Sequence, residues 1–530
     1  MTKGIFKLSR SWQFWTLLFI IILNLIIAII PIVKGIFPFT FDQGRDLLWV
    51  KNQIDFRKLY LIGPWGGLSG AFFGAFWYWF LIIPFILSNG DPIAITIFNA
   101  LLVYGSIIAA AWVISKYSKT TAYFICLLGF LSVPFQYIAS YPFSEHLLPI
   151  LTFILVFSYA KILASSDTRY FYLALFAIAL MFHAEPPVSV FSFPSVFLIT
   201  LISKNRKKIL NAKTIFFGFL IFLIPFLPQI LFDFRHDFIQ TKAFIGVLTG
   251  ANRSLGGILP FPERVVDRLY KILNAFGDNF LYQSVFISFP VLAFAFWTNL
   301  KHKGNSFLHQ ILWASYWYII SLYMIFTVYP PEFKEFYLEG IYIISIIFLA
   351  FAFSSLWENK KWRIPIIMFF ILSFICHKQP LQLIQSQSNN FNDRKNQGSL
   401  YRNQTDIVSW VYQKARGEGF RVYTYDPAIY DYPFQYLFLR EGLTKYGYLP
   451  EEFSYLPKKP EYVDMKDKQM QRYREKIKTA GKIIFLIIQP ETEKERIIFW
   501  QSHFPSKEYK LLEKKQFPDN TTVEKLQNIR

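Results

Sequence analysis

Long runs of apolar residues dominate the first three quarters of the chain and are separated by short polar loops. The first run, WTLLFIIILNLIIAIIPIV, begins at Trp15, and no small-residue cleavage site follows it. Runs of about 18 or more apolar residues are long enough to cross the hydrocarbon core of a bilayer. We therefore expect a retained membrane span here rather than a cleaved signal peptide.

The same pattern predicts a polytopic, mainly α bundle of about eleven spans. Their centres lie near Ile22, Gly105, Leu128, Phe153, Ala177, Phe197, Leu220, Ile287, Tyr318, Ser345 and Phe369. A further run from Ala71, AFFGAFWYWFLIIPFIL, is interrupted by Pro84 and would make a twelfth span if it crossed. The basic loops all share one face only if this run does not cross, because Lys and Arg concentrate in cytoplasmic loops. We therefore expect a re-entrant or juxtamembrane helix on the outer face.

The basic loops also orient the chain. Lys and Arg occur in the N-terminal tail and in every second loop between spans, which predicts a cytoplasmic N-terminus and an extracytoplasmic C-terminus. Membrane orientation accounts for much of the net charge of +20, so no nucleic-acid partner is expected. The two cysteines both lie in apolar runs and cannot build a disulfide framework or a thiolate metal site.

The composition becomes polar after the last apolar run. The segment TDIVSWVYQKARGEG predicts an amphipathic helix with Thr405 or Asp406 near its N-cap. FRVYTYDP and GKIIFLIIQP predict buried strands bounded by Gly and Pro. We therefore predict two domains: a transmembrane catalytic domain over 1–379, with an outer loop over 35–91, and a small extracytoplasmic α/β domain over 380–530.

The outer loop opens with FPFTFDQGRDLLWVKNQ, which places Asp42, Arg45 and Asp46 directly after the first span. Asp42 and Asp46 are four residues apart and would share a helix face. A carboxylate can take the proton from an attacking hydroxyl, and a guanidinium can bind a phosphate bidentately. This combination favours glycosyl transfer from a lipid-phosphate sugar. Alternatively, Asp42 is the N-cap of a short helix, and Arg45 only pairs with an acid.

These features resemble the GT-C superfamily of polytopic membrane glycosyltransferases, and the chain is similar to the family-39, aminoarabinose-transferase and protein O-mannosyltransferase types. The shared architecture is a cytoplasmic N-terminus, one helix and a long outer loop with an acid near its start. In these families the loop typically carries Asp-Glu, followed in some members two residues later by Arg. Asp42 and Arg45 match, whereas Gln43 replaces the second acid. The resemblance covers roughly residues 1–380.

The resemblance implies an inverting transferase that uses a polyprenyl- or dolichyl-phosphate sugar at the extracytoplasmic face, with a lipid, protein or glycan acceptor. It implies Asp42 as the general base, with Asp46 and Glu145 as further candidate catalytic acids. Glu145, in SYPFSEH, occupies the place of an acid in relatives, or is a solvated loop acid or helix N-cap. No cofactor is expected to be required, although the carboxylates of these three residues are ligands that Mg²⁺ or Mn²⁺ would accept.

Further candidate ligands come from the other outer segments. The stretch GAFWYW from Gly74 resembles the helix ahead of the family's second span but lacks the Lys-Pro-Pro sequence that holds the donor phosphate in some members. Candidate phosphate ligands are therefore Arg45, Lys334, Arg235 and His236, and candidate substrate contacts are Trp77, Tyr78, His183, Glu185 and Tyr337. The alternatives are a helix-end role for His183 and Glu185 and an interface-anchor role for Lys334 and Tyr337.

Three other functions remain open at this stage. A lipid-linked glycan flippase or transporter would also have many spans, but it would usually show internal repeats and charges near the middle of the membrane. A polymerase or ligase of the O-antigen type would use a diphosphate donor and would carry its long outer loop late in the chain. A non-catalytic envelope-assembly subunit fits if Gln43 marks a decayed site. The abundance of Lys, Ile, Phe and Asn suggests a bacterial source, which would place the chain in the plasma membrane.

Overall fold

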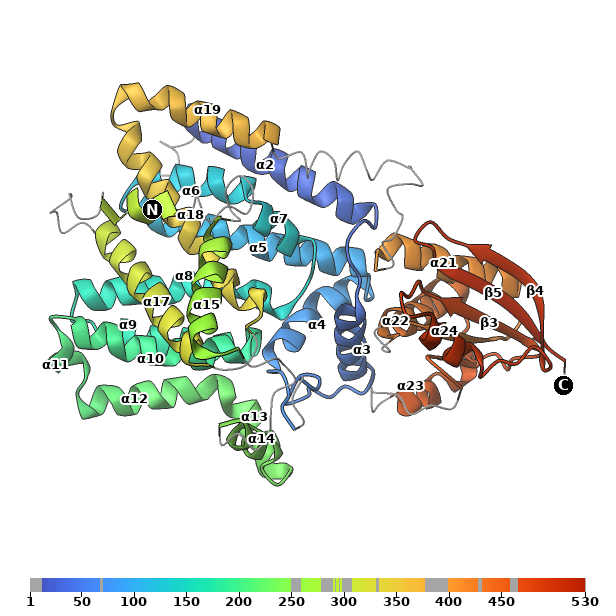
Figure 1. Cartoon of the computed structure of the whole chain (residues 1–530). Helices are drawn as coiled ribbons and strands as arrows, with labels where there is room; N and C mark the ends of the chain where they lie inside the picture. The colour runs from blue at the N-terminus through green and yellow to red at the C-terminus, as the bar shows by residue number, and fades with distance from the viewer. Residues whose placement is uncertain are drawn as a thin grey trace. The chain divides into compact units, whose positions relative to one another are not determined.

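The chain is predominantly helical and ends in a small β-sheet (Figure 1). The computed structural model describes residues 12–66, 70–248, 259–277, 289–290, 292–294, 296–297, 307–329, 333–376, 399–427, 431–457 and 466–529. Two compact units make up the fold. Unit 1 consists of Met1–Ala28, Tyr60–Trp77 and Phe98–Gln379, and unit 2 consists of Ile29–Leu59, Tyr78–Ile97 and Pro380–Arg530.

Helices that lie wholly or mostly in unit 1 account for the apolar runs. They are α2 (Trp12–Val33), α5 (Pro92–Ser115), α6 (Lys119–Leu131), α7 (Val133–Ala139), α8 (Leu148–Ala164), α9 (Arg169–Ala184), α10 (Pro186–Ile202), α11 (Arg206–Ile209), α12 (Ala212–Leu223), α13 (Leu227–Arg235), α14 (Ile239–Leu248), α15 (Phe261–Gly277), α17 (Phe307–Val328), α18 (Glu339–Trp357) and α19 (Lys360–Cys376), with the short helices η1 (Ser144–Leu147), η2 (Ile224–Phe226) and η3 (Glu335–Leu338). The most deeply buried of the long spans is α18, which packs against α6 and α8. Buried apolar residues lie on every side of α18, as expected for a helix at the centre of a bundle.

Ten of the eleven expected span centres fall in a helix, and the centre near Ile287 lies outside the described residues. Within the described part of the chain, five helices or joined helices are long and apolar enough to cross a membrane, namely Pro92–Ser115, Ser144–Ala164, Ala212–Arg235, Phe307–Val328 and Glu335–Trp357. The pair α6 and α7, bent by 62°, would make a sixth if it is one span. The structure therefore supports a polytopic bundle, while the number of eleven crossings stays a prediction.

The run from Ala71 forms α4 (Phe76–Ser88), a helix of 13 residues that contains Pro84. At about 1.5 Å per residue it is about 20 Å long, shorter than the roughly 30 Å hydrocarbon core of a bilayer. This length is consistent with the expectation that the run does not cross the membrane. Its placement on the outer face stays a prediction.

The C-terminal part of unit 2 is an α/β domain built on a five-stranded sheet. Its elements are α21 (Tyr401–Ala415), β1 (Arg421–Tyr425), α22 (Tyr432–Glu441), η5 (Gly442–Tyr446), β2 (Glu452–Ser454), α23 (Lys466–Arg472), η6 (Arg474–Lys476), β3 (Ile483–Ile488), α24 (Lys494–Gln501), β4 (Tyr509–Gln516) and β5 (Thr522–Asn528). The strand order is β2-β1-β3-β5-β4, with β1 parallel to β2 and β3 and with β5 antiparallel to β3 and β4. The two predicted strands, β1 and β3, are confirmed as its buried centre.

The predicted N-cap of the amphipathic helix is wrong. Helix α21 begins at Tyr401, with Leu400 as its N-cap, and the hydroxyl of Thr405 donates to the carbonyl of Arg402 in the first turns of the helix. Leu400 is held in an extended conformation because it pairs with Pro38 in an isolated β-bridge. The start of this helix is thus set by a residue far away in the sequence.

Unit 2 also contains α3 (Phe41–Asp55), which follows the first span directly. The last segment of unit 2 begins at Pro380, and the predicted division into two domains stays a prediction. However, residues 29–59 and 78–97, which lie within the predicted membrane domain, belong to the same compact unit as the C-terminal domain. The helix that carries the candidate base is therefore packed together with the α/β domain.

Candidate active site

Helix α3 begins with a capping box. The backbone N–H of Thr40 donates to Oε1 of Gln43 over 2.8 Å, and the Thr40 hydroxyl donates to the same oxygen over 2.6 Å. A Thr-x-x-Gln sequence is a standard form of this motif. The alternative that Asp42 is the N-cap is therefore wrong. Gln43, which departs from the acid expected from the resemblance, is buried and fixes the start of the helix.

Replacement of Gln43 by alanine should destabilise the protein by about 1 kcal/mol, because the cap loses its side-chain partner. We expect the melting temperature of the detergent-solubilised protein to fall by roughly 2–4 °C. Thr40→Ser keeps the hydroxyl and is the matched control, with a melting temperature near that of the wild type. An unchanged melting temperature for Gln43→Ala would mean that the capping box does not contribute to stability.

One turn further on, Arg45 lies between two carboxylates. Its Nη1 is 2.9 Å from Oδ1 of Asp42, and its Nη2 is 2.8 Å from Oδ1 of Asp46, which also accepts from Nε over 3.0 Å. The exposed fractions of the three side chains are 19% for Asp42, 13% for Arg45 and 4% for Asp46. Asp42 is thus the more accessible acid, whereas Asp46 is buried against the guanidinium.

Burial raises the pKa of Asp42 above its ordinary value, and the neighbouring Arg45 only partly opposes this effect. Helix α3 lies outside the candidate membrane spans. A carboxylate with a raised pKa is a stronger base than a free aspartate. Tyr78, buried in α4, is close enough to Arg45 to interact with it electrostatically, so this predicted substrate contact belongs to the same cluster.

Unit 1 holds a second polar cluster, at the starts of α8 and α18. Glu145 lies buried in η1, which contradicts its alternative reading as a solvated loop acid. Its neighbour His146 contacts Oε2 of Glu339 through Nδ1 over 2.8 Å. Glu185, the N-cap of α10, is buried and interacts electrostatically with Glu339. Glu145 and Glu185 thus lie at helix ends of unit 1. His146 and Glu339, which were not predicted as site residues, lie there too.

A metal site finds no direct support in this part of the molecule. Among the described residues there is no group of three or more His, Cys, Asp or Glu side chains arranged to hold a metal ion. The use of Mg²⁺ or Mn²⁺ by Asp42, Asp46 and Glu145 stays an untested prediction.

His183 occupies a tightly packed position in unit 1. Its ring stacks on Phe76 with centroids 4.1 Å apart, and Nε2 lies 2.9 Å from the carbonyl oxygen of Pro225. A Cβ at Gly74 would collide with the same ring. These contacts favour a structural role for His183, and its contact with substrate stays a prediction. Trp77 is buried, and its indole N–H has no hydrogen-bond partner among the described residues.

The remaining predicted ligands lie at helix ends of unit 1. Lys334 is exposed as the N-cap of η3, and Arg235 is exposed at the end of α13. The ring of His236 stacks on Phe232 with centroids 4.0 Å apart. Tyr337 is half-buried and packs edge to face against Phe333.

Sequence reasoning missed three cations on α15. Arg264, Arg268 and Lys271 are spaced by four and three residues and therefore share one helix face. Arg264 Nη1 donates to the carbonyl of Val328 over 2.9 Å, and Lys271 Nζ donates to the carbonyl of Phe333 over 2.9 Å. The guanidinium of Arg268 is buried 5.1 Å from the centre of the Phe333 ring. The spacing of the three residues was the available signal, but the segment lies between the apolar runs centred near Leu220 and Ile287 and has no apolar run of its own.

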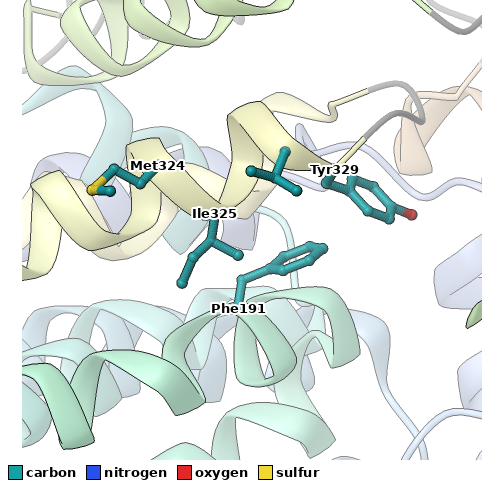
Figure 2. A pocket seen from close by; sticks show the side chains of 5 residues that line it. Phe191, Met324, Ile325 and Tyr329 are labelled. Carbon is teal, nitrogen blue, oxygen red and sulfur yellow. The ribbon is translucent and has the colours of Figure 1, made fainter. Parts of the chain in front are cut away.

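An apolar cavity of about 450 Å³ lies between α10 and α17 (Figure 2). It is lined by Phe191, Met324, Ile325, Val328 and Tyr329. The carbonyl of Val328 accepts from Arg264, and Tyr329 interacts electrostatically with Arg268. The basic face of α15 therefore lies beside one end of an apolar cavity.

Comparison with known proteins settles the fold. No family model and no curated protein matches the chain. The solved structures that match include two of ArnT, an aminoarabinose transferase, from Cupriavidus metallidurans. The structure bound to undecaprenyl phosphate has a TM-score of 0.56 at 13% identity, and the apo structure has a TM-score of 0.58 at 10% identity. Each comparison covers 97% of this chain and 98% of the other.

The chain has the GT-C fold. The resemblance expected from the sequence is thus confirmed, and it extends over nearly the whole chain rather than the first 380 residues. The GT-C fold and the long apolar helices together make the chain a multi-pass membrane protein. At 10–13% identity, the likeness establishes the fold and no more.

Proposed function

We propose that the chain is a membrane glycosyltransferase that moves a sugar from a polyprenyl-phosphate donor to an acceptor hydroxyl on the extracytoplasmic face, with inversion. The observation that carries this proposal is the buried Asp42–Arg45–Asp46 cluster at the start of α3. The GT-C fold supports it, because a protein of this fold is seen bound to undecaprenyl phosphate. The fold also favours a transferase over the flippase and scaffold alternatives.

In this proposal Asp42 acts as the general base. It accepts the proton of the acceptor hydroxyl while that oxygen forms a bond to the anomeric carbon of the sugar. The bond from this carbon to the donor oxygen breaks, and its electron pair leaves with the polyprenyl phosphate. Attack and departure occur on opposite faces of the sugar, which inverts the anomeric centre.

Arg45 donates to both Asp42 and Asp46, so we assign it first to the orientation of the base. Phosphate binding by Arg45, as the resemblance implies, would compete with these contacts. The basic face of α15, in unit 1, is a separate candidate for binding the donor phosphate. The guanidinium of Arg268 is buried and matches phosphate geometry, but it pairs with Asp267, so phosphate binding would compete with that contact, as at Arg45.

The cavity in Figure 2 supports a lipid-linked donor. Its lining is apolar, and it lies beside the cationic residues Arg264 and Arg268. An isoprenoid chain with a phosphate head would match an apolar groove with positive charge at one end. We place the protein in the bacterial plasma membrane with a cytoplasmic N-terminus and the C-terminal domain outside, as the basic loops predict.

The proposal is tested by donor turnover. The purified protein is given a panel of labelled polyprenyl-phosphate sugars with an envelope-acceptor extract, and release of polyprenyl phosphate is followed. We expect release with at least one sugar and none with the matching polyprenyl-diphosphate sugars. Release only from diphosphate donors would favour a polymerase or ligase. No release from any donor, with an active GT-C transferase as positive control, would overturn the proposal.

A further inference from the structure

The segment that leads into α3 is held by the C-terminal part of unit 2. Pro38 and Leu400 form an antiparallel bridge, and the N–H of Phe39 donates to the carbonyl of Ser399 over 2.7 Å. The N–H of Tyr401 donates to the carbonyl of Phe37 over 3.1 Å, and the two rings stack 4.9 Å apart. Backbone hydrogen bonds thus fix the entry to α3.

The backbone of α3 then touches the start of α22 directly. A Cβ built at Gly44 would lie 2.5 Å from the carbonyl carbon of Tyr432 and 2.5 Å from the nitrogen of Pro433. Only glycine permits this approach. Glycine inside a helix costs about 1 kcal/mol relative to alanine, so the contact must offset that cost.

The far end of α3 is tied to the same domain by a polar triad. The Tyr473 hydroxyl lies 2.8 Å from Oδ1 of Asp55 and 2.8 Å from Nζ of Lys51. Nζ of Lys51 is also 3.1 Å from Oδ1 of Asp55. The C-terminal domain therefore contacts the segment that precedes α3, the N-terminal part of α3 and the C-terminal part of α3.

We propose that the C-terminal domain is a positioning platform for the catalytic helix α3, and that Gly44 is the positioning residue that sets the location of Asp42. This inference rests on the proposed function, in which Asp42 is the base. Gly44 lies between Asp42 and Arg45 in the sequence, so any displacement of α3 at Gly44 moves both side chains.

The expected effect follows from the geometry. A Cβ makes ordinary contacts from about 3.4 Å, so Gly44→Ala requires α3 and α22 to separate by roughly 3.4 − 2.5 = 0.9 Å. A misplacement of about 1 Å can lower the rate of an enzyme by roughly 100-fold. We therefore expect kcat of Gly44→Ala to fall by roughly 100-fold, with the KM for the donor nearly unchanged.

The experiment compares the full-length wild type, Gly44→Ala and the control Gly105→Ala. Gly105 also lies inside a helix, but a Cβ there meets nothing within 4 Å. We would measure kcat, the KM for the donor, the acid limb of the pH–rate profile and amide hydrogen exchange along α3. Displacement of Asp42 changes its burial and its distance from Arg45, so the acid limb should shift in Gly44→Ala. A loss of folded protein alone would lower the apparent kcat without moving that limb.

A second variant keeps the inference falsifiable if Gly44→Ala does not fold. Tyr473→Phe removes only the hydroxyl that binds Lys51 and Asp55. It should speed amide exchange in the last turn of α3 and lower kcat by a few fold. Wild-type exchange in α3 for both variants, or for Tyr473→Phe alone, would overturn the inference. If the wild type turns over no donor, the proposed function fails, and the exchange measurements still decide whether the domain holds α3.

Discussion

Replacement of Asp42 by asparagine is expected to lower turnover by about 10²–10⁴-fold, the usual contribution of a general base. The amide has the shape of the carboxylate but cannot accept the proton of the acceptor hydroxyl. Arg45 keeps its contacts with Asp46, so the rest of the cluster should stay in place. Binding of the polyprenyl-phosphate donor, measured separately, should therefore change little.

The pH dependence of turnover gives this prediction a second test. Below its pKa, Asp42 is protonated and cannot act as a base, so kcat/KM should fall as the pH falls through that value. Because burial raises the pKa of Asp42, the acid limb should lie above the range of a free aspartate. The limb should be absent from the residual activity of Asp42→Asn and retained in the control Asp46→Asn. Wild-type turnover by Asp42→Asn would place the base elsewhere, with Glu145 and Asp46 as the next candidates.

Replacement of Arg45 by methionine should destabilise unit 2 by about 3–5 kcal/mol, the range observed when one partner of a buried ion pair is removed. The reason is that Asp46, with 4% of its side chain exposed, loses its cation. The unpaired carboxyls then have raised pKa values in the folded state. At low pH these carboxyls are protonated in both the folded and the unfolded protein, so stability is retained. Stability is lost as the pH rises through their folded-state pKa values.

The measurement is thermal unfolding of the solubilised protein across a pH series. Arg169→Met is the matched control, because its ion pair with Asp167 has a similar distance of 2.7 Å but an arginine that is 84% exposed. The melting temperature of this control should stay near that of the wild type, since exposed pairs contribute little. Equal effects of the two substitutions would show that the Arg45 cluster is not a buried network.

The parts of the site that the sequence predicted are those set by local spacing. Asp42, Arg45 and Asp46 lie at i, i+3 and i+4, so a helix brings them together without any distant contact. Apolar run lengths likewise predicted most of the helices of unit 1. The capping role of Gln43 could be recognised only in the structure, because a capping box is defined by the residue at which the helix begins.

The features that the sequence did not predict depend mainly on contacts between residues that are distant along the chain. Nothing near Gly44 in the sequence signals its approach to Tyr432 and Pro433, which lie almost 400 residues later. Strand β4 was missed because it is an edge strand with mostly exposed residues, which hides the apolar alternation of a buried strand. The basic face of α15 was missed because its helix has no continuous apolar run, which was the signal used to find helices.

The split of unit 2 along the chain has a consequence for biosynthesis. Chains fold from the N-terminus as they are made, and Gly44 is synthesised 432 − 44 = 388 residues before Tyr432. Helix α3 cannot reach its final packing until the last segment has been translated and has joined it. A chain that stops early inserts its first helices but never completes the support of Asp42. Under the proposed function, a chain without its last segment would therefore lack a positioned base, and turnover would require the full-length product.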